Sequence, residues 1–338
     1  ASQGRWGYID RRGAWMADPV YLEAWPFSEG LAPVRSASNG RWGYVGRSIP
    51  PLFGGRNFEE AGAFSDGLAL VSDEGEKHYI DVQGWDAFEG VFADARDFSE
   101  GLAAVLSGDR WGYIDHKGRM VIPPRFEAAG PCSEGLLAVR MKGRWGFIDR
   151  KGNWAVKNVY DEVWTFSEGL AAVRRGKKLG YVDVSGKLRV PCRFGVPSRG
   201  SEAGRFSEGL AAVLSGGKTL FVDKKGNAVI RGDFVPWTGE APRFRWGVAC
   251  LETSKGRWRY VNRGGRYIGE PPVGSVNAVS GSAPGILPYR SDSGAWGYRD
   301  MDGTVVVPPF LDAARPFKGG IAAVSLGGRW WYIAEPGR

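Results

Sequence analysis

The sequence predicts an all-β protein built from tandem repeats of about 34–40 residues. Three observations support this prediction. Two short motifs alternate along the chain, the segments between them have the residues of short strands and tight turns, and the composition is unusual. The 338 residues include 52 Gly and 15 Trp but only 2 His. A unit that repeats one Trp and several turn glycines would produce this excess.

Composition also limits the classes of function. Hydrophobic residues make up 43% of the chain, which is too many for a disordered protein. No run of ~18 apolar residues is present, so we expect no membrane-spanning helix. Three Cys are too few for a disulfide-rich scaffold, and two His leave little room for a metal site or a nucleophilic triad. We therefore expect no metal, no cofactor and no enzymatic activity.

The first motif, Trp-Gly-Tyr-Ile-Asp, predicts a β-strand in each repeat. Its Trp and Tyr are two residues apart, so they lie on the same face of a strand. The Gly between them has no side chain, which lets a neighbouring backbone approach closely. The aromatic residue at the Tyr position recurs at a spacing of 34 to 40 residues as Tyr8, Tyr44, Tyr79, Tyr113, Phe147, Tyr181, Phe221, Tyr260, Tyr298 and Tyr332.

The second motif, Phe-Ser-Glu-Gly-Leu, lies between copies of the first. It leads into an Ala-Ala-Val strand, a Gly-containing turn and then the Trp-Gly-Tyr strand, which is the pattern of a β-hairpin. An Asp-x-x-Gly turn and a third strand ending in Pro complete the unit, giving about three short strands per repeat. Copies of the second motif begin at Phe27, Phe64, Phe98, Cys132, Phe166 and Phe206, with weaker copies at Phe244, Ala283 and Phe317.

Together the two motifs resemble the WG-repeat family, named for its Trp-Gly pair. The resemblance covers residues 4–335, is strong in the fourth and fifth repeats, and is weakest at residues 45–57 and 231–290. It implies a β-rich repeat protein of the kind usually found in bacteria, often joined to other modules, with no shared catalytic activity.

The count of motifs bears on the architecture. There are ten copies of the first motif and nine of the second, so the chain begins and ends on the same half-unit. A closed ring would need equal numbers. We therefore predict one array over residues 1–338, an open twisted β-hairpin array of about nine repeats with terminal half-repeats as caps. A closed propeller-like ring is the alternative.

The charge pattern favours an acidic partner. The net charge is +8 and the pI is near 9.4, but the basic residues are dispersed. An Arg precedes the motif Trp in six repeats, and these Arg either form a positive stripe or pair with the repeated motif Glu; we favour the pairing. Nucleic acid is then an unlikely partner. Because the acidic residues recur in every repeat, they are interpreted as structural rather than catalytic.

The candidate binding site lies near three insertions. The segment before the second motif is longer than usual within residues 191–204, 231–243 and 269–282, and such insertions often mark the binding face of a repeat protein. Trp237, Arg243 and Trp246 lie beside the middle insertion and are our first choice; drift in poorly constrained loops is the alternative.

Two further tryptophans occupy one repeat position. Trp25 and Trp164 stand where other repeats have Gly, Arg or Pro, so this position is expected to be partly exposed. Exposed Trp is typical of an interface or of a platform on which a sugar ring stacks, whereas simple edge packing is the alternative.

These observations predict a non-enzymatic protein that binds another protein, with an inhibitor or immunity-type protein of an exported bacterial system as a concrete version. The alternative is a carbohydrate-binding or cell-wall-binding module that uses exposed Trp. The chain begins Ala1-Ser2-Gln3 without Met, which fits a cleaved export signal or a trimmed terminus. We expect a periplasmic or secreted location over a cytoplasmic one.

Overall fold

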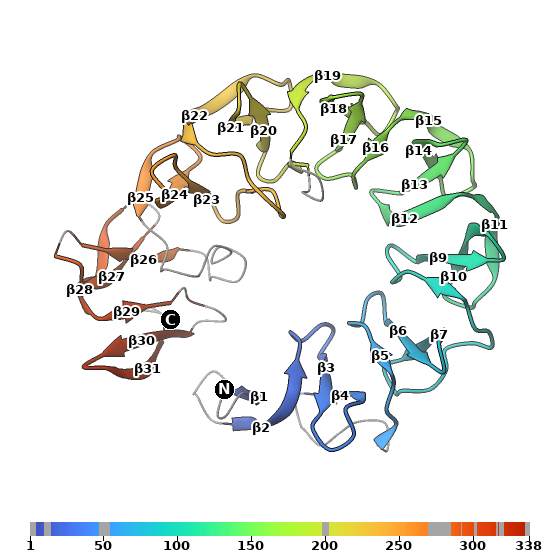
Figure 1. The fold of residues 1–338 in the computed structure, drawn as a ribbon, viewed down its shortest axis with the longest axis horizontal. Helices are drawn as coiled ribbons and strands as arrows, with labels where there is room; N and C mark the ends of the chain where they lie inside the picture. Colours follow the sequence, from blue (N-terminus) through green and yellow to red (C-terminus); the bar gives the residue numbers. More distant parts are fainter. Residues whose placement is uncertain are drawn as a thin grey trace. The chain divides into compact units, whose positions relative to one another are not determined.

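The computed structural model describes residues 5–9, 15–46, 55–197, 203–269, 285–291, 293–300, 303–315, 317 and 321–334. By its contacts the chain divides into two compact units, the first of residues 1–165 and 184–186, the second of residues 166–183 and 187–338. The regular elements of both units are β-strands, which confirms the predicted class (Figure 1). The single array over residues 1–338 and its open or closed form remain predictions.

The first unit contains four small antiparallel sheets. The first two sheets are formed by β1 (Trp6–Ile9), β2 (Trp15–Ala24), β3 (Leu31–Ser36) and β4 (Trp42–Gly46), and by β5 (Glu60–Ala61), β6 (Leu68–Asp73) and β7 (Glu76–Asp81). The third is formed by β8 (Asp94–Ala95), β9 (Leu102–Ser107), β10 (Arg110–Asp115) and β11 (Met120–Phe126). The fourth is formed by β12 (Ala128–Ser133), β13 (Leu136–Met141), β14 (Arg144–Asp149) and β15 (Trp154–Tyr160); β16 (Glu162–Val163) follows it in the chain.

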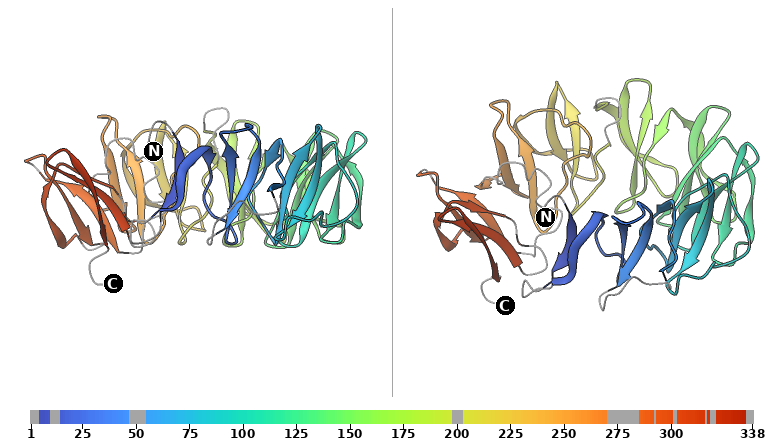
Figure 2. Two further views of the ribbon diagram at one scale, coloured as in Figure 1. Left: turned by 90° about the horizontal axis from the view of Figure 1, so that it is seen from below. Right: turned by 60° about the horizontal axis from the view of Figure 1, so that its bottom comes forward.

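The second unit repeats this plan. Its first sheet runs through β17 (Leu170–Arg175), β18 (Lys178–Asp183), β19 (Leu188–Gly195), β20 (Ala211–Ser215), β21 (Lys218–Val222) and β22 (Ala228–Phe234). Three-stranded sheets follow, formed by β23 (Val248–Glu252), β24 (Trp258–Asn262) and β25 (Tyr267–Gly269), by β26 (Ile286–Arg290), β27 (Trp296–Asp300) and β28 (Val305–Leu311), and by β29 (Ala313–Ala314), β30 (Ile321–Leu326) and β31 (Arg329–Ala334). Figure 2 shows the strands grouped into such short sheets.

Each repeat is an antiparallel meander of the predicted three strands, and several repeats add a short fourth strand. The predicted hairpin is exact in register in the third repeat, where Trp111 pairs with Leu106 and Tyr113 with Ala104. The additional strand, such as β8, lies just before the second motif and pairs with the Ala-Ala-Val strand. A strand of two residues has no alternating pattern, so nothing in the sequence indicated it.

The motif glycine is required because the third strand crosses over it. A step of two residues from Trp111 to Tyr113 is matched by a step of four in β11, from Phe126 to Ile122, so β11 bulges at this point. A Cβ on Gly112 would lie 2.6 Å from the carbonyl oxygen of Ile122. The predicted close backbone approach is therefore confirmed.

The core lies between successive sheets. Tyr113, Ile122 and Phe126 of one sheet pack against Leu137 and Ile148 of the next, and all five are at most 1% exposed. The hydroxyl of the motif Tyr reaches the edge of this layer, where it donates to a backbone carbonyl such as that of Gly130, 2.9 Å from the Tyr113 hydroxyl. Each sheet thus buries the apolar face of its neighbour, as expected in a repeat protein.

The Ser and Glu of the second motif connect one repeat to the next. The Ser65 hydroxyl donates to the carbonyl of Phe98 at 2.7 Å, and the Asp66 carboxylate accepts the N–H of Gly101 at 2.6 Å. We call this pair of bonds the Ser-Glu staple. The hydroxyl bond recurs from Ser28, Ser99, Ser167 and Ser207, and the carboxylate bond from Glu29, Glu100, Glu168 and Glu208.

The acidic residue of the staple also adopts a left-handed backbone conformation. The φ angle is 54° at Asp66 and 51° at Glu100. Burial alone would raise the pKa of Glu100, but hydrogen bonds from the backbone N–H groups of Gly135 and Glu134 outweigh it and lower that pKa. The repeated acids are thus engaged in holding the repeats together, which is the structural role predicted for them.

We predicted that the repeated Arg pairs with the motif Glu. This prediction is wrong for the repeated Arg residues whose ion-pair partners the structure shows. Arg41 pairs with Asp73 and Arg144 with Asp161, and neither acid belongs to the second motif. The motif carboxylates are directed at backbone N–H groups of the next repeat, so their geometry is set by the staple.

The Asp-x-x-Gly turn is a carboxylate-capped turn. Asp149 accepts the backbone N–H groups of Asn153 at 2.8 Å and Lys151 at 2.9 Å, and Gly152 adopts a φ of 87°. The bonds from Asn153, together with the one from Lys151, lower the pKa of Asp149. The pKa values of Asp115 and Asp223 are lowered in equivalent turns.

These lowered pKa values predict a loss of stability in acid. A carboxyl with a lower pKa in the folded state stabilises it above the unfolded-state pKa of about 4, and this contribution disappears as the pH falls through the folded-state value. We expect the urea midpoint to drop between pH 7 and about pH 3. The triple variant Asp115→Asn, Asp149→Asn and Asp223→Asn should drop less, because Asn262 holds the same turn without ionising. An equal drop in both proteins would contradict this explanation.

Candidate functional site

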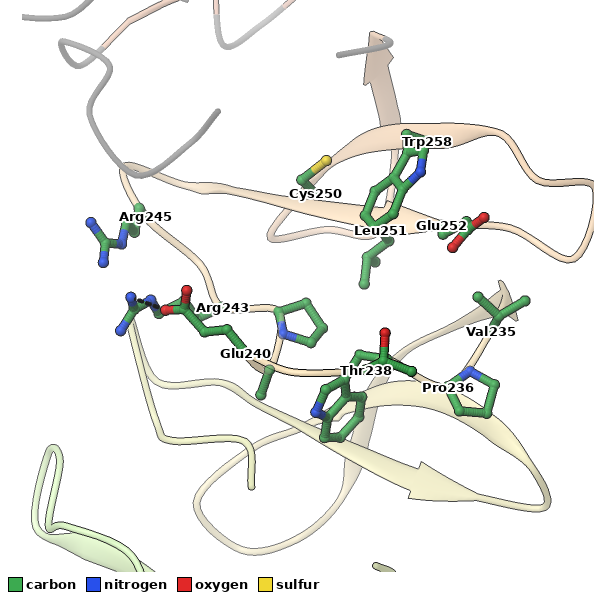
Figure 3. A pocket seen from close by; sticks show the side chains of 13 residues that line it. Val235, Pro236, Thr238, Glu240, Arg243, Arg245, Cys250, Leu251, Glu252 and Trp258 are labelled. Atoms are coloured by element: carbon green, nitrogen blue, oxygen red, sulfur yellow. Dashed lines mark hydrogen bonds and ion pairs between the residues drawn. The ribbon is translucent and has the colours of Figure 1, made fainter. Parts of the chain in front are cut away.

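A hollow of about 460 Å³ opens in the second unit beside the middle insertion. One wall is the segment 235–243, which continues from β22, and the other is the hairpin of β23 and β24. Figure 3 shows Pro236 and Thr238 on one side of the hollow and Leu251 and Trp258 on the other. We call it the Trp237 hollow. Its volume lies in the range of pockets that bind small molecules or inserted side chains.

Two hydrogen bonds fix the position of the middle insertion near its start. The N–H of Val235 donates to the carbonyl of Glu252 at 2.9 Å, and the Thr219 hydroxyl donates to the carbonyl of Val235 at 2.6 Å. These bonds fix the point where the segment leaves the sheet. Pro236 and Pro242 restrict the backbone within it. The hollow is therefore bounded by constrained backbone.

The walls of the Trp237 hollow are largely apolar. Trp237 is half-buried and packs against the core cluster that contains Phe234 and Leu251. Trp258, which takes the place of the motif Trp, is half-buried and packs against the cluster that contains Cys250. The indoles of Trp237 and Trp258 therefore both line the hollow, and Leu251 of β23 lines it as well.

One end of the hollow is positively charged. Arg243 forms an ion pair with Glu240, and Arg245 lies next to them (Figure 3). Burial, with the positive charges of Arg243 and Arg205 nearby, lowers the pKa of Arg245. The guanidinium groups of Arg243 and Arg205 thus lie within electrostatic range of Arg245, and the Glu240 carboxylate is paired with Arg243.

The third predicted residue, Trp246, belongs to the adjacent turn. Residues 244–247, which we call the Phe244 turn, are the seventh copy of the second motif. Trp246 is 41% exposed, and its φ of 51° places a bulky side chain in the left-handed region. The structure therefore brings Trp237 and Arg243 together on one hollow, and Trp246 lies on the turn whose Arg245 lines it.

The remaining two predicted residues lie in other places. In the first unit, Trp25 is 44% exposed, makes an edge contact with Trp42 at 5.6 Å between ring centroids, and lines a second hollow of about 380 Å³. Trp164 is half-buried and lines neither of these two hollows. Both are partly exposed, as predicted for their shared repeat position.

Sequence analysis missed several residues of the Trp237 hollow. The repeat pattern did not mark Trp258, Leu251 or Glu252 as site residues, because they occupy ordinary positions of the first motif and of the hairpin strand before it. Arg245 could have been found, since it replaces the Ser of the second motif. Residues 198–202 of the first insertion and residues 270–282 of the third lie outside the described residues.

Reactive groups are few in the part of the chain that the structure describes. Cys132, Cys192 and Cys250 are all free thiols, and burial raises the pKa of both Cys132 and Cys250 to about 12. No group of three or more His, Cys, Asp or Glu there could hold a metal ion. Nor do the described ranges contain a helix long and apolar enough to cross a membrane.

Comparison with solved structures gives distant similarities. A eukaryotic initiation factor superposes with a TM-score of 0.52 at 12% identity, covering 97% of this chain and 93% of that one. The computationally designed Ika8 protein has a TM-score of 0.49 at 14% identity, covering 91% and 95%. BamB from Moraxella catarrhalis has a TM-score of 0.47 at 13% identity, covering 83% and 91%. A comparison with curated proteins gave no match.

Sequence families give a direct assignment. The model of the WG containing repeat matches residues 6–45, 87–111, 111–145, 145–178, 180–218 and 296–330, which together are more than half of the chain. The unmatched stretches include residues 219–295, which contain the Trp237 hollow and the Phe244 turn. With its repeated Trp-Gly strands and Ser-Glu staples, the chain belongs to the WG-repeat family.

Proposed function

We propose that this protein is a non-enzymatic scaffold that binds another protein through the Trp237 hollow and the Phe244 turn. The observation that carries the proposal is the hollow itself, a space of mixed polarity with two indoles on its walls and arginines at one end. Aromatic residues and Arg are the side chains that contribute most to protein–protein binding. A repeat protein with such a surface is suited to recognition.

The absence of enzymatic activity is supported by the use of the repeated acids. Glu100 accepts N–H groups from the next repeat, and Asp149 accepts those of its own turn. A carboxylate in that position is already occupied by hydrogen bonds and has a lowered pKa, which is the opposite of what a general acid requires.

A specific version is an inhibitor or immunity-type protein in an exported bacterial system, located in the periplasm or secreted. The basic net charge of +8 favours an acidic partner in that setting. Cell fractionation with antibody detection tests the location, and inhibition of a co-expressed secreted toxin tests the role.

The alternative is carbohydrate binding. It is favoured by tryptophans that are more exposed than those of the hollow, since Trp85 is 72% exposed and Trp331 is 55% exposed. A flat exposed indole can stack on a sugar ring. Cell-wall pull-down with wild-type protein and with Trp85→Ala distinguishes this function from protein binding, because the Trp237 hollow is unchanged in that variant.

Replacing Trp237 and Trp246 together by Ala should weaken partner binding by at least about tenfold. The cause is the loss of two aromatic contacts at the hollow and on its neighbouring turn. Partners are captured from native extract on immobilised protein, identified by mass spectrometry, and their affinity is then measured by calorimetry. Trp331→Ala removes an exposed Trp elsewhere in the second unit and is the matched control.

The fold of the double variant is checked by its urea midpoint. A folded double variant that binds as tightly as wild type would show that the site lies elsewhere. Loss of binding in Trp331→Ala alone would move the site to β31. Hydrolysis of cell-wall glycans by the purified wild-type protein would contradict the non-enzymatic assignment.

A further inference from the structure

The Phe244 turn differs in the two residues that make the staple from the six strong copies of its motif, which begin at Phe27, Phe64, Phe98, Cys132, Phe166 and Phe206. Where those copies have Ser followed by Glu or Asp, this turn has Arg245 and Trp246. It still receives a staple from the preceding repeat, because Ser207 donates to the carbonyl of Phe244 at 2.5 Å and Glu208 accepts the N–H of Gly247 at 2.8 Å. The turn is thus bound by the staple of the preceding repeat in the same way as the other copies.

The turn lacks the side chains with which the strong copies make a staple to the following repeat. An indole has no oxygen that could accept the N–H of a following Gly, so Trp246 cannot make the carboxylate bond of the staple. The turn nevertheless keeps its backbone bonds, with Arg245 and Val248 exchanging N–H···O bonds at 2.9 and 3.1 Å. The local fold is conserved while the staple residues are not.

This exchange is unfavourable for the isolated turn. A left-handed conformation costs roughly 1–2 kcal/mol for a residue with a Cβ, and at Trp246 it is not offset by the carboxylate bond that Glu208 makes from the same repeat position. The indole is also 41% exposed, so a large part of its apolar surface faces the solvent. Strained residues are concentrated at functional sites.

The neighbouring charges indicate what the turn recognises. Arg245 lines the Trp237 hollow together with Arg243, and Arg243 already holds one carboxylate, that of Glu240. Such an arrangement can accept a second carboxylate beside Arg245. A phosphate or sulfate group, with a larger negative charge or more bulk, would approach the Glu240 carboxylate as well and be repelled by it.

We propose that the Phe244 turn and the Trp237 hollow recognise an acidic segment of a partner protein, in which an apolar side chain enters the hollow between Trp237 and Trp258 and an adjacent Asp or Glu pairs with Arg245. This rests on the proposed function and gives the partner its chemistry. Trp246 then covers the bound segment from the solvent side. Charge and shape complementarity together set the specificity.

The test uses the repeat's own consensus. Arg245→Ser with Trp246→Glu restores the usual motif, so the variant should fold at least as well as wild type, with an equal or higher melting temperature. The probe is a displayed library of random twelve-residue peptides selected on the full chain. We expect the selected peptides to carry Asp or Glu next to Leu, Phe or Trp, and to bind the double variant at least about tenfold more weakly.

Two controls separate the possible causes. The reverse exchange, Ser99→Arg with Glu100→Trp, removes a staple in the first unit; it should lower the melting temperature and leave peptide binding unchanged. Binding to wild type should weaken between about 50 and 500 mM salt, because an ion pair with Arg245 is partly exposed and screened.

The outcomes distinguish this inference from the proposed function. Selected peptides without acidic residues that still lose binding in Trp237→Ala would overturn the acidic chemistry and leave the hollow as the binding site. Peptides whose binding survives both Trp237→Ala and the consensus exchange would overturn both. Selective binding of a sulfated oligosaccharide, with no peptide enriched, would also overturn the inference.

Discussion

Gly146→Ala should lower the free energy of unfolding by about 3 kcal/mol. A Cβ at this position would lie 2.5 Å from the carbonyl oxygen of Val156 and 2.7 Å from the backbone nitrogen of Asn158. Both atoms are backbone of β15, which bulges over β14, so neither can move without breaking the ladder. The measurement is the urea midpoint, with unfolding monitored by Trp fluorescence.

The chain offers a matched control for this substitution. Gly43 occupies the same motif position, yet a Cβ there would lie 3.4 Å from the side-chain oxygen of Asn57 and 3.8 Å from the carbonyl oxygen of Arg56, which are ordinary van der Waals distances. Gly43→Ala should therefore change the free energy of unfolding by less than about 1 kcal/mol. If the two substitutions cost the same, the close approach of the third strand would not be the reason for the motif glycine.

Phe206→Ala should cost about 3–5 kcal/mol, because it removes a fully buried ring from between two repeats. Phe206 is 1% exposed and meets the ring of Tyr181 edge-on, with 4.9 Å between centroids. The contact recurs in other repeats, as for Tyr79 with Phe98. Removing one ring leaves a cavity that the surrounding strands cannot fill.

The control for this variant is an exposed ring in the same unit. Phe310 is 55% exposed on β28, and Phe310→Ala should change stability by no more than about 0.5 kcal/mol. Differential scanning calorimetry compares the two variants. Equal melting temperatures for Phe206→Ala and wild type would show that the motif Phe is not the core residue that joins the repeats.

Most of the fold was predictable because each repeat presents the same pattern again. The hairpin in each repeat, the close approach over the motif Gly and the structural role of the repeated acids all follow from residues that occur many times, such as Gly112 and Asp66. A residue type that recurs at one position of most repeats meets a similar environment each time, so repetition itself points to structural residues.

What the sequence did not predict concerns relations between repeats. The partners of Arg41 and Arg144 are acids outside the motifs, because the motif Glu is already bound to the backbone of the next repeat. The Ser-Glu staple joins residues 33 to 41 positions apart, and no local pattern indicates such a pairing. The fourth strand, such as β8, is too short to have a pattern.

The candidate site could be predicted in part for the opposite reason. Trp237 and Arg243 stood out because they belong to no motif, and the structure places both on one hollow. Trp258 did not stand out, because it occupies the motif position itself. Arg245 and Trp246 were informative only as departures from Ser and Glu. A departure from a repeat is therefore more informative about function than the repeat.

Site-specific photo-crosslinking tests the central claim, that a partner binds at the Trp237 hollow and the Phe244 turn. A benzophenone amino acid replaces Trp246 in one protein and the exposed Trp331 in another, and both are irradiated in native extract. We predict one crosslinked partner from position 246, none from position 331, and competition by excess wild-type protein but not by the Arg245→Ser, Trp246→Glu variant. The same partner crosslinked equally from both positions, or competition by that variant, would contradict the claim.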